Sequence, residues 1–221
     1  FLGSLDGNFS AAFDKQGNEI WNTGDSSLVM YNTNLKGELY GCHYEESLEN
    51  SYPAMEFDLD VNYLWEEPND NFVHHDIIKL PDGNYLGIGE TTENHPIPIN
   101  GPWYTQCLQQ YGSFVCDGNY FPWVGDKLII WDKDTKDILW EWSVFDYYDI
   151  ADYDGAYYDD GIYGGSWTFS ISDFRYDWTH VNAVTFTQDE NAIYISCRHL
   201  SRITKIHFNI DNYDDDDNGE F

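Results

Sequence analysis

The chain has 221 residues, with 10 Lys and Arg against 40 Asp and Glu, which gives a formal net charge of −30. Such a charge is repelled by phosphate backbones and by anionic lipid headgroups, so it excludes nucleic acid as a partner and predicts divalent cations at the acidic surface. Aromatic residues make up 18% of the chain, which is enough for a packed core on which the acidic residues form the surface. No apolar run approaches the roughly 18 residues that a membrane span needs, so no membrane insertion is expected.

Features near the start of the chain and the cysteines bear on the compartment. The chain begins Phe1-Leu2-Gly3-Ser4, without the basic and apolar regions of a signal peptide. Cys107 and Cys116 lie close together in a stretch rich in Gly, Tyr and Gln, which predicts a disulfide and an oxidising, extracellular or periplasmic location. Cys42 and Cys197 lie in strand-like runs. Two alternatives remain for them, namely two buried free thiols or a second disulfide.

In chain order, the first recurring element is a hairpin in which an Asp-rich turn leads into a strand that ends in Trp. It occurs three times, from Asp14 to Trp21, from Asp58 to Trp65 and from Asp132 to Trp140. Short β-branched and aromatic runs separated by Asp, Asn and Gly turns are typical of strands, and helical periodicity is hard to find. The pattern predicts an all-β protein in which each Trp packs between sheets.

A second type of hairpin lies between those repeats. The segments 80–88 and 187–195 align without a gap, each with an Asp-containing turn followed by a strand. Two alternating hairpin types make four-stranded units, and units at roughly 40- to 50-residue spacing are typical of a β-propeller. A β-sandwich is the main alternative, but it does not explain the alternation. We therefore predict a single propeller segment over 1–221, with insertions at about 93–125 and 146–175.

The last residues match the first half of another Trp hairpin, with a strand at 203–208, an acidic turn and then Gly219-Glu220. Counting units gives roughly three to four blades, fewer than a closed propeller typically has. We expect the chain to be part of a longer polypeptide, or its ring to be completed by another chain.

Four polar residues fall where the strands of the second hairpin type begin or end. Because side chains alternate along a strand, His180 and Asn182 are expected to share a face, and His75 to occupy the equivalent inward position in its own blade. Arg198 follows the last apolar residues of a later strand. Imidazoles, an amide and a guanidinium around a central channel suit an anion, with His for proton transfer and Arg for oxyanion binding. His74 remains an alternative to His75 at the inward position. A purely structural role, in which these polar residues cap or bridge blades, is the alternative to an anion site.

Three motifs resemble the bacterial-type arylsulfotransferases, the PAPS-independent arylsulfate sulfotransferases, over roughly residues 55–210. They are His74-His75-Asp76 with the turn at 80–84, Asp177-Trp178-Thr179-His180-Val181-Asn182, and Ser196-Cys197-Arg198-His199-Leu200-Ser201.

The resemblance implies a six-bladed propeller that moves a sulfuryl group between phenols through a transient sulfo-histidine, without a nucleotide cofactor such as PAPS. It implies that His75, His180, Asn182 and Arg198 line the channel and hold a phenolic sulfate or another small anion. In the family the nucleophilic His follows the Arg element in a later blade. Only His199 and His207 follow Arg198 here, and neither has that context, so the nucleophile is expected outside the matched region.

Other functions fit parts of the sequence. A non-catalytic acidic extracellular propeller that serves as a scaffold or structural subunit fits the missing nucleophile, and a sugar-binding or sugar-hydrolysing propeller fits the many Trp and Tyr residues. Asp214, Asp216 and Asn218, followed by Gly219, have the spacing of a calcium loop, but the same segment fits a solvated hairpin turn. The arylsulfotransferase-like reading is our first prediction and the scaffold its alternative.

Overall fold

A computed structural model describes residues 2–4, 9–34, 36–44, 52–68, 73–99, 104–105, 107–108, 112–118, 120–152 and 176–221. The described residues form an all-β structure in which the strands build four sheets. Within each sheet, strands that follow one another in the chain pair with antiparallel neighbours. The exception is β12 (Tyr176–Asp177), which pairs parallel with β10. The all-β prediction is therefore confirmed.

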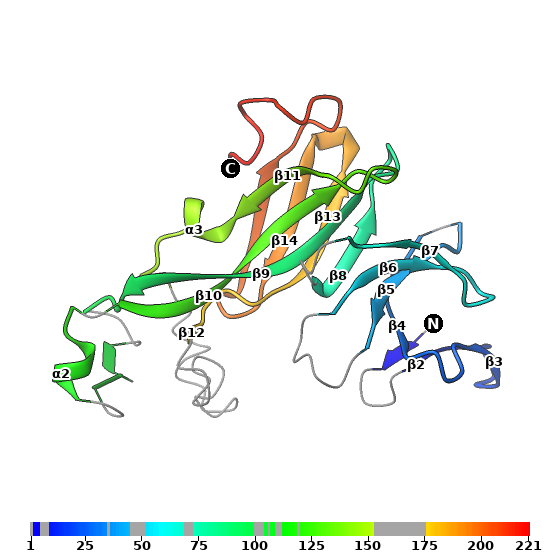
Figure 1. Ribbon diagram of the computed structural model, residues 1–221, viewed down its shortest axis with the longest axis horizontal. Helices are drawn as coiled ribbons and strands as arrows, with labels where there is room; N and C mark the ends of the chain where they lie inside the picture. The colour runs from blue at the N-terminus through cyan, green and yellow to red at the C-terminus, as the bar shows by residue number, and fades with distance from the viewer. Residues whose placement is uncertain are drawn as a thin grey trace.

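The first two sheets come from the first third of the chain (Figure 1). One sheet contains β1 (Leu2–Ser4), β2 (Phe9–Phe13) and β3 (Glu19–Asn22). The next contains β4 (Leu28–Thr33), β5 (Leu39–His43), β6 (Ala54–Phe57) and β7 (Tyr63–Glu66).

The other two sheets form the second part of the molecule. The third sheet contains β8 (Val73–Lys79), β9 (Tyr85–Pro96), β10 (Tyr120–Trp131) and β11 (Ile138–Ser143), with β12 alongside β10. The fourth contains β13 (Val181–Thr187), β14 (Ala192–Cys197) and β15 (Arg202–His207). The turn between β13 and β14 is a 3₁₀ turn, η2 (Gln188–Glu190).

The three Trp hairpins are present as β2–β3, β6–β7 and β10–β11. In each hairpin the carboxylate of the first turn residue accepts hydrogen bonds from backbone N–H groups within the turn. The Oδ1 atom of Asp14 accepts from Asn18 at 2.8 Å, and that of Asp58 accepts from Asn62 at 2.9 Å. These Asx turns explain why an Asp opens each repeat, because the side chain supplies the acceptors that close the turn.

Successive sheets pack face to face, and each contact has its own hydrophobic core. Alternate residues of one strand serve different cores, as side-chain alternation requires. In β10, Ile129 packs toward the second sheet with Trp65, whereas Leu128 packs toward the fourth sheet with Ile195. Both faces of the third sheet are thus buried, which explains the continuous apolar run in β10.

The first strands of the last three sheets lie side by side. The strands β4 and β8 are in contact, and so are β8 and β13. Asp76 of β8 joins all three, because its carboxylate accepts from Asn32 Nδ2 of β4 at 3.3 Å and from the Val184 N–H of β13 at 3.1 Å. Residues far apart in the chain are therefore brought together along these first strands.

The first predicted insertion is partly an extension of the third sheet. The strands β9 and β10 stay paired from Tyr85–Trp131 out to Pro96–Tyr120, and Figure 1 shows this arm running toward α2 (Ser113–Cys116). The predicted disulfide joins Cys107 to Cys116 at its end, whereas Cys42 and Cys197 are buried free thiols.

The second predicted insertion is described only at its start. It opens with the helix α3 (Val144–Tyr147), and residues 153–175 lie outside the described residues. The described part of the chain contains no helix long and apolar enough to cross a membrane.

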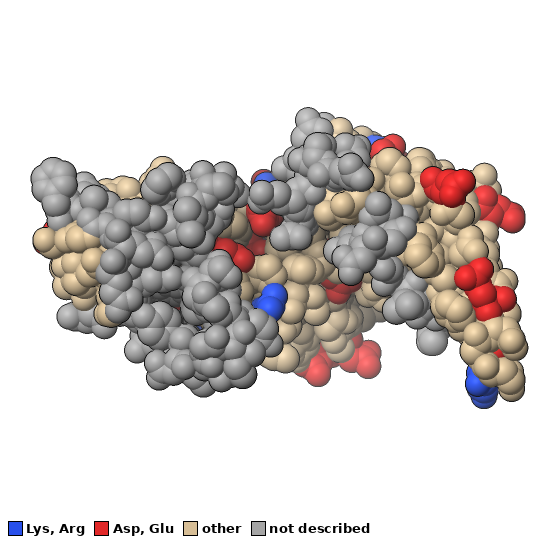
Figure 2. All heavy atoms as spheres, turned by 90° about the horizontal axis from the view of Figure 1, so that it is seen from below, with Lys and Arg blue, Asp and Glu red and all other residues tan. Residues whose placement is uncertain are grey.

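The end of the chain turns back along β15. The backbone N–H of Gly219 donates to the carbonyl of His207 at 2.9 Å, and that of His207 donates to the carbonyl of Glu220 at 2.7 Å. Within the acidic turn, the Asn218 side-chain oxygen accepts from the Asn209 N–H at 2.6 Å. The amide oxygen of Asn218, which has the spacing of a calcium-loop ligand, is therefore already used to close the hairpin. On the face drawn in Figure 2, acidic side chains are spread over the outer surface of the described residues.

Candidate functional site

Two histidines from different sheets meet where β8 and β13 lie together. The Nε2 atom of His75 lies 3.0 Å from the Nε2 atom of His180, and the ring centroids are 4.9 Å apart. Both rings are half-buried. A hydrogen bond between two ring nitrogens needs one N–H and one lone pair, so the pair shares one proton along this line.

Both histidines have left-handed backbone conformations, with φ of 65° at His75 and 46° at His180. Residues other than Gly rarely adopt this backbone conformation. Holding a residue in it costs free energy, which contacts with the surrounding structure must offset. At His75 it coincides with a register shift in β8, between Val73 and Ile77. From this irregular stretch of backbone, His75 contacts His180 in the segment before β13.

The other side of His180 is held by Asp177. The Nδ1 atom of His180 donates to the Asp177 carboxylate across 2.7 Å. This contact sets the tautomer, because it places the proton on Nδ1 of the neutral ring and leaves the Nε2 lone pair facing His75. Asp177, His180 and His75 thus form a carboxylate–imidazole–imidazole chain, which is an arrangement suited to proton transfer.

His199 completes the group from the end of β14. Its ring stacks on that of His180 with centroids 4.7 Å apart, and its Nδ1 donates to the Asp177 carbonyl at 2.9 Å. Two backbone hydrogen bonds join the segments, from Arg198 N–H to the His180 carbonyl at 3.1 Å and from His199 N–H to the Thr179 carbonyl at 3.2 Å. Backbone hydrogen bonds therefore hold the segment that contains His180 against the segment that contains His199.

A buried carboxylate beneath the site positions two of its segments. Asp126 of β10 is 3% exposed. One of its oxygens lies 2.6 Å from Nε2 of His74, and the other accepts from the Val181 N–H at 2.8 Å and from the Thr179 hydroxyl. Asp126 thus anchors Thr179 and Val181, which flank His180, and His74, which precedes His75.

Burial and neighbouring charges separate the protonation states of these groups. Burial, aided by the nearby His74 and His180, lowers the pKa of His75 to about 4. Burial also opposes charge on His74, but the hydrogen bond and charge of Asp126 outweigh it, so the pKa of His74 is raised. The same contact outweighs burial at Asp126 and lowers its pKa. At neutral pH His75 is therefore neutral, whereas the contact between His74 and Asp126 favours the charged form of both partners.

Arg198 and Asn182 are both exposed. The Arg198 backbone contacts His180, and its charge adds to burial in lowering the pKa of both His75 and His199. Asn182 lies at a bulge, because Val181 pairs with Cys197 and Ala183 with Ser196. The alternation expected for His180 and Asn182 does not apply, since His180 precedes β13 and the bulge interrupts the strand. The structure thus brings His75, His180 and Arg198 together and leaves Asn182 at the exposed bulge.

The sequence analysis gave no role to three groups of this site, namely Asp126, Asp177 and His199. A signal for Asp126 was present, since an acidic residue within the apolar run of a strand needs a buried partner. Asp177 was part of the Asp-Trp-x-His-x-Asn motif, but its role depends on the turn that brings its carboxylate back to His180.

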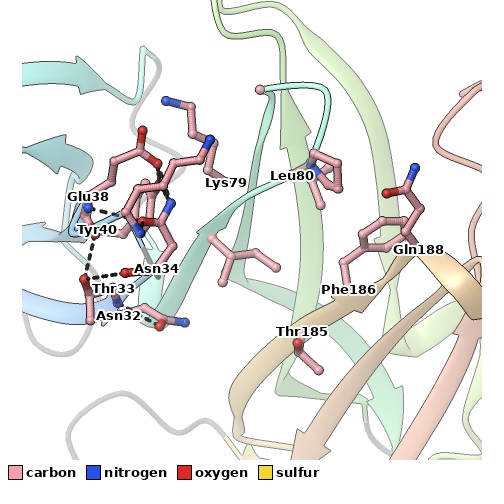
Figure 3. Close-up of a pocket in the computed structure, with 14 residues that line it drawn as sticks. Asn32, Thr33, Asn34, Glu38, Tyr40, Lys79, Leu80, Thr185, Phe186 and Gln188 are labelled. Atoms are coloured by element: carbon pink, nitrogen blue, oxygen red, sulfur yellow. Dashed lines mark hydrogen bonds between the residues drawn. The ribbon is translucent and has the colours of Figure 1, made fainter.

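A separate hollow of about 590 Å³ lies toward the far ends of the first strands. Figure 3 shows Asn32 and Thr33 at the end of β4, Lys79 at the end of β8 and Phe186 near the end of β13 around it. Its lining mixes charged residues such as Lys79 and Glu38 with apolar ones such as Phe186, and none of the histidines described above contributes to it. The histidine site, in which a carboxylate and two imidazoles form a hydrogen-bonded chain, is the stronger candidate for chemistry.

Comparison with known proteins agrees with the sequence motifs. Residues 110–217 match the family model described as Arylsulfotransferase (ASST), which confirms the resemblance over these residues. The matched region contains Asp126, Asp177, His180 and Arg198, whereas His75 lies before it. No curated protein matches the chain.

Proposed function

We propose that this chain is part of an arylsulfotransferase-like β-propeller that binds an aryl sulfate or a similar small anion at His75, His180 and Arg198. The observation that carries the proposal is the contact of His75 with His180 beside Arg198, within a chain whose residues 110–217 match the arylsulfotransferase family.

In this proposal the cationic and neutral groups have separate roles. The guanidinium of Arg198 donates hydrogen bonds to the sulfuryl oxygens, where negative charge is stabilised during transfer. The bond between sulfur and the phenolic oxygen breaks, and the donor leaves as a phenolate. The sulfuryl group moves to a nucleophilic His supplied outside the matched region, and then to the acceptor phenol. The neutral His75–His180 pair accepts the proton of the acceptor phenol and passes it to the released phenolate. No nucleotide such as PAPS takes part.

The ring that would surround this site is also a proposal. Four meander sheets that pack face to face, with β4, β8 and β13 side by side, support a propeller in which further blades or another chain complete the ring. The Cys107–Cys116 disulfide supports an extracellular or periplasmic location.

A sulfotransfer assay tests the proposal on the polypeptide that contains this chain. A chromogenic phenyl sulfate serves as donor and a second phenol as acceptor. We expect Arg198→Ala and His180→Ala each to lower kcat/KM by about 100-fold or more, the range seen for loss of an oxyanion or proton-transfer group. Lys205→Ala, which removes an exposed cation paired with Glu190, is the control and should leave the rate unchanged.

The alternative function is a non-catalytic acidic scaffold in the extracellular space. It is favoured by the net charge of −30, which slows the approach of an anionic substrate. An intact protein that shows no transfer with any phenyl sulfate, and equal anion binding in the wild type and Arg198→Ala, would favour the scaffold and overturn the site assignment.

A further inference from the structure

We infer that Asp177, His180 and His199 form a binding site for a transition-metal ion such as Zn²⁺. Among the residues that the structure describes, these three are the one group of at least three His, Cys, Asp or Glu side chains whose potential ligand atoms all lie within 4.8 Å of one another. The site shares His180 with the proposed anion site, but metal binding alone tests it.

The distances within the group are close to those of a metal site. Zn²⁺ holds His nitrogen and carboxylate oxygen at about 2.0 to 2.2 Å, so tetrahedral ligands lie about 3.3 Å from one another. The Asp177 Oδ2 atom is 2.7 Å from Nδ1 of His180 and 3.8 Å from Nδ1 of His199. These two separations bracket the required one, and the ligand atoms of His180 and His199 lie within 4.8 Å of each other. Binding an ion would therefore require side-chain rotations.

The donor set indicates the class of ion. Two imidazoles and one carboxylate suit Zn²⁺ and its first-row neighbours, whereas Mg²⁺ and Ca²⁺ prefer oxygen ligands throughout. Three protein ligands leave at least one position of the ion open. The exposure of the side chains, 35% for Asp177, 14% for His180 and 2% for His199, places that opening on the Asp177 side, where water can complete the coordination.

The backbone holds the ligands in place before any ion binds. Asp177 and His180 are joined by a short segment whose Thr179 and Val181 are anchored on the buried Asp126. His199 is joined to that segment by its hydrogen bond to the Thr179 carbonyl. Such anchoring lowers the entropy lost on binding, because the ligand positions are largely set by the fold.

Metal binding would also change the His75–His180 contact. If Nδ1 of His180 coordinates the ion, the ring proton must move to Nε2, since a neutral imidazole carries one N–H. The same holds for His199, whose Nδ1 would give up its hydrogen bond to the Asp177 carbonyl. His180 would then donate to Nε2 of His75, rather than accept from it. The ion would in this way fix the direction of the hydrogen bond between the two rings.

Calorimetric titration of the metal-free full chain with ZnCl₂ tests the inference, with excess MgCl₂ present to occupy the acidic surface. We expect one ion per chain with a Kd in the micromolar range or below, and at least a ten-fold weaker Kd for Asp177→Asn and for His199→Gln. His95→Gln removes a histidine that pairs with Glu93 elsewhere, so it is the matched control and should bind as the wild type does.

Absorption spectra with Co²⁺ give a second readout, because its visible bands report coordination by protein nitrogen. We expect these bands in the wild type and in His95→Gln, and their loss in Asp177→Asn. If the buried His199 variant does not fold, the more exposed Asp177 variant still decides the question. Equal stoichiometry and affinity in all variants, or several weak equivalent ions, would show that only the acidic surface binds metal and would overturn the inference.

Discussion

The Nε2 atoms of His75 and His180 lie 3.0 Å apart although the residues are 105 positions apart in the chain. Both residues have positive φ angles, so the contact exists only where two irregular backbone segments face one another. Asp177 holds the far nitrogen of His180. Positive φ at a non-Gly residue costs free energy that the surrounding contacts have to offset.

Asp177 is predicted to act as a positioning residue for His180. In Asp177→Asn the amide can still accept a hydrogen bond, but the negative charge that stabilises an imidazolium is lost. We expect kcat for sulfuryl transfer to fall by about 10- to 100-fold with little change in KM, which is the pattern of a lost transition-state interaction. Steady-state kinetics measure this, with the exposed Asp189→Asn as control. An unchanged kcat would remove Asp177 from the mechanism.

His75 is predicted to make the fold sensitive to acid. Its pKa is about 4 in the folded protein and about 6.5 in the unfolded chain. As the pH falls below 6.5, the unfolded chain takes up the proton first, so stability is lost until about pH 4. With one pKa unit worth about 1.4 kcal/mol and some solvent screening of the partly exposed ring, the loss is about 2 kcal/mol.

Urea unfolding at pH 7.0 and at about pH 4.5 measures this effect. The free energy of unfolding should fall less on acidification in His75→Gln than in the wild type, whereas His95→Gln should behave as the wild type. An identical pH dependence in all three proteins would contradict a depressed pKa at His75.

Asp76 is predicted to have the opposite effect in the same pH range. Burial raises its pKa to about 6, above the value of about 3.9 in an unfolded chain. The folded protein therefore binds this proton first as the pH falls from 6 toward 4, and the carboxyl group contributes a gain in stability of about 2 to 3 kcal/mol.

The Asp76→Asn variant removes that gain while keeping the size of the side chain and one acceptor oxygen, which can still accept from the Val184 N–H. We expect its free energy of unfolding to fall more steeply than that of the wild type between pH 6 and pH 4. Asp189→Asn, at an exposed turn, is the control. A slope equal to that of the wild type would show that Asp76 is ionised throughout this range.

Two glycines of the second strands are predicted to differ sharply in their tolerance of Ala. A Cβ atom at Gly41 of β5 would lie 1.9 Å from the Val29 carbonyl oxygen of β4, so the two strands would have to separate. A Cβ atom at Gly89 of β9 would meet the end of the Ile129 side chain at 3.3 Å, which can move. We expect Gly41→Ala to lose about 3 kcal/mol or more, or to fail to fold, and Gly89→Ala to lose under about 1 kcal/mol. Thermal unfolding compares them, and equal losses would contradict the close strand contact.

Much of the strand structure could be predicted because it depends on local chemistry. Asp14, Asp58 and Asp132 close their turns with their own carboxylates, so the signal lies within a few residues. The Cys107–Cys116 bridge was likewise predicted from two cysteines close in the chain. Of the two neighbouring histidines, His75 contacts His180 and His74 pairs with Asp126.

The positions of Asn182 and Asp126 could not be predicted in the same way. The face of Asn182 was inferred from regular alternation, and a bulge between Val181 and Ala183 interrupts it. The partners of Asp126 come from β8 and from the segment before β13, and no local pattern shows which strands will pack against β10.

The sequence by itself determined the all-β class, the Asp-opened hairpins and the acidic composition, because each depends on composition or on neighbours along the chain. The tertiary structure decided which histidine faces which, the role of Asp126 and Asp177, and the grouping of Asp177, His180 and His199. These features depend on the register and bulges of strands from different sheets. Packing over the whole molecule sets that register, and short-range propensity does not encode it.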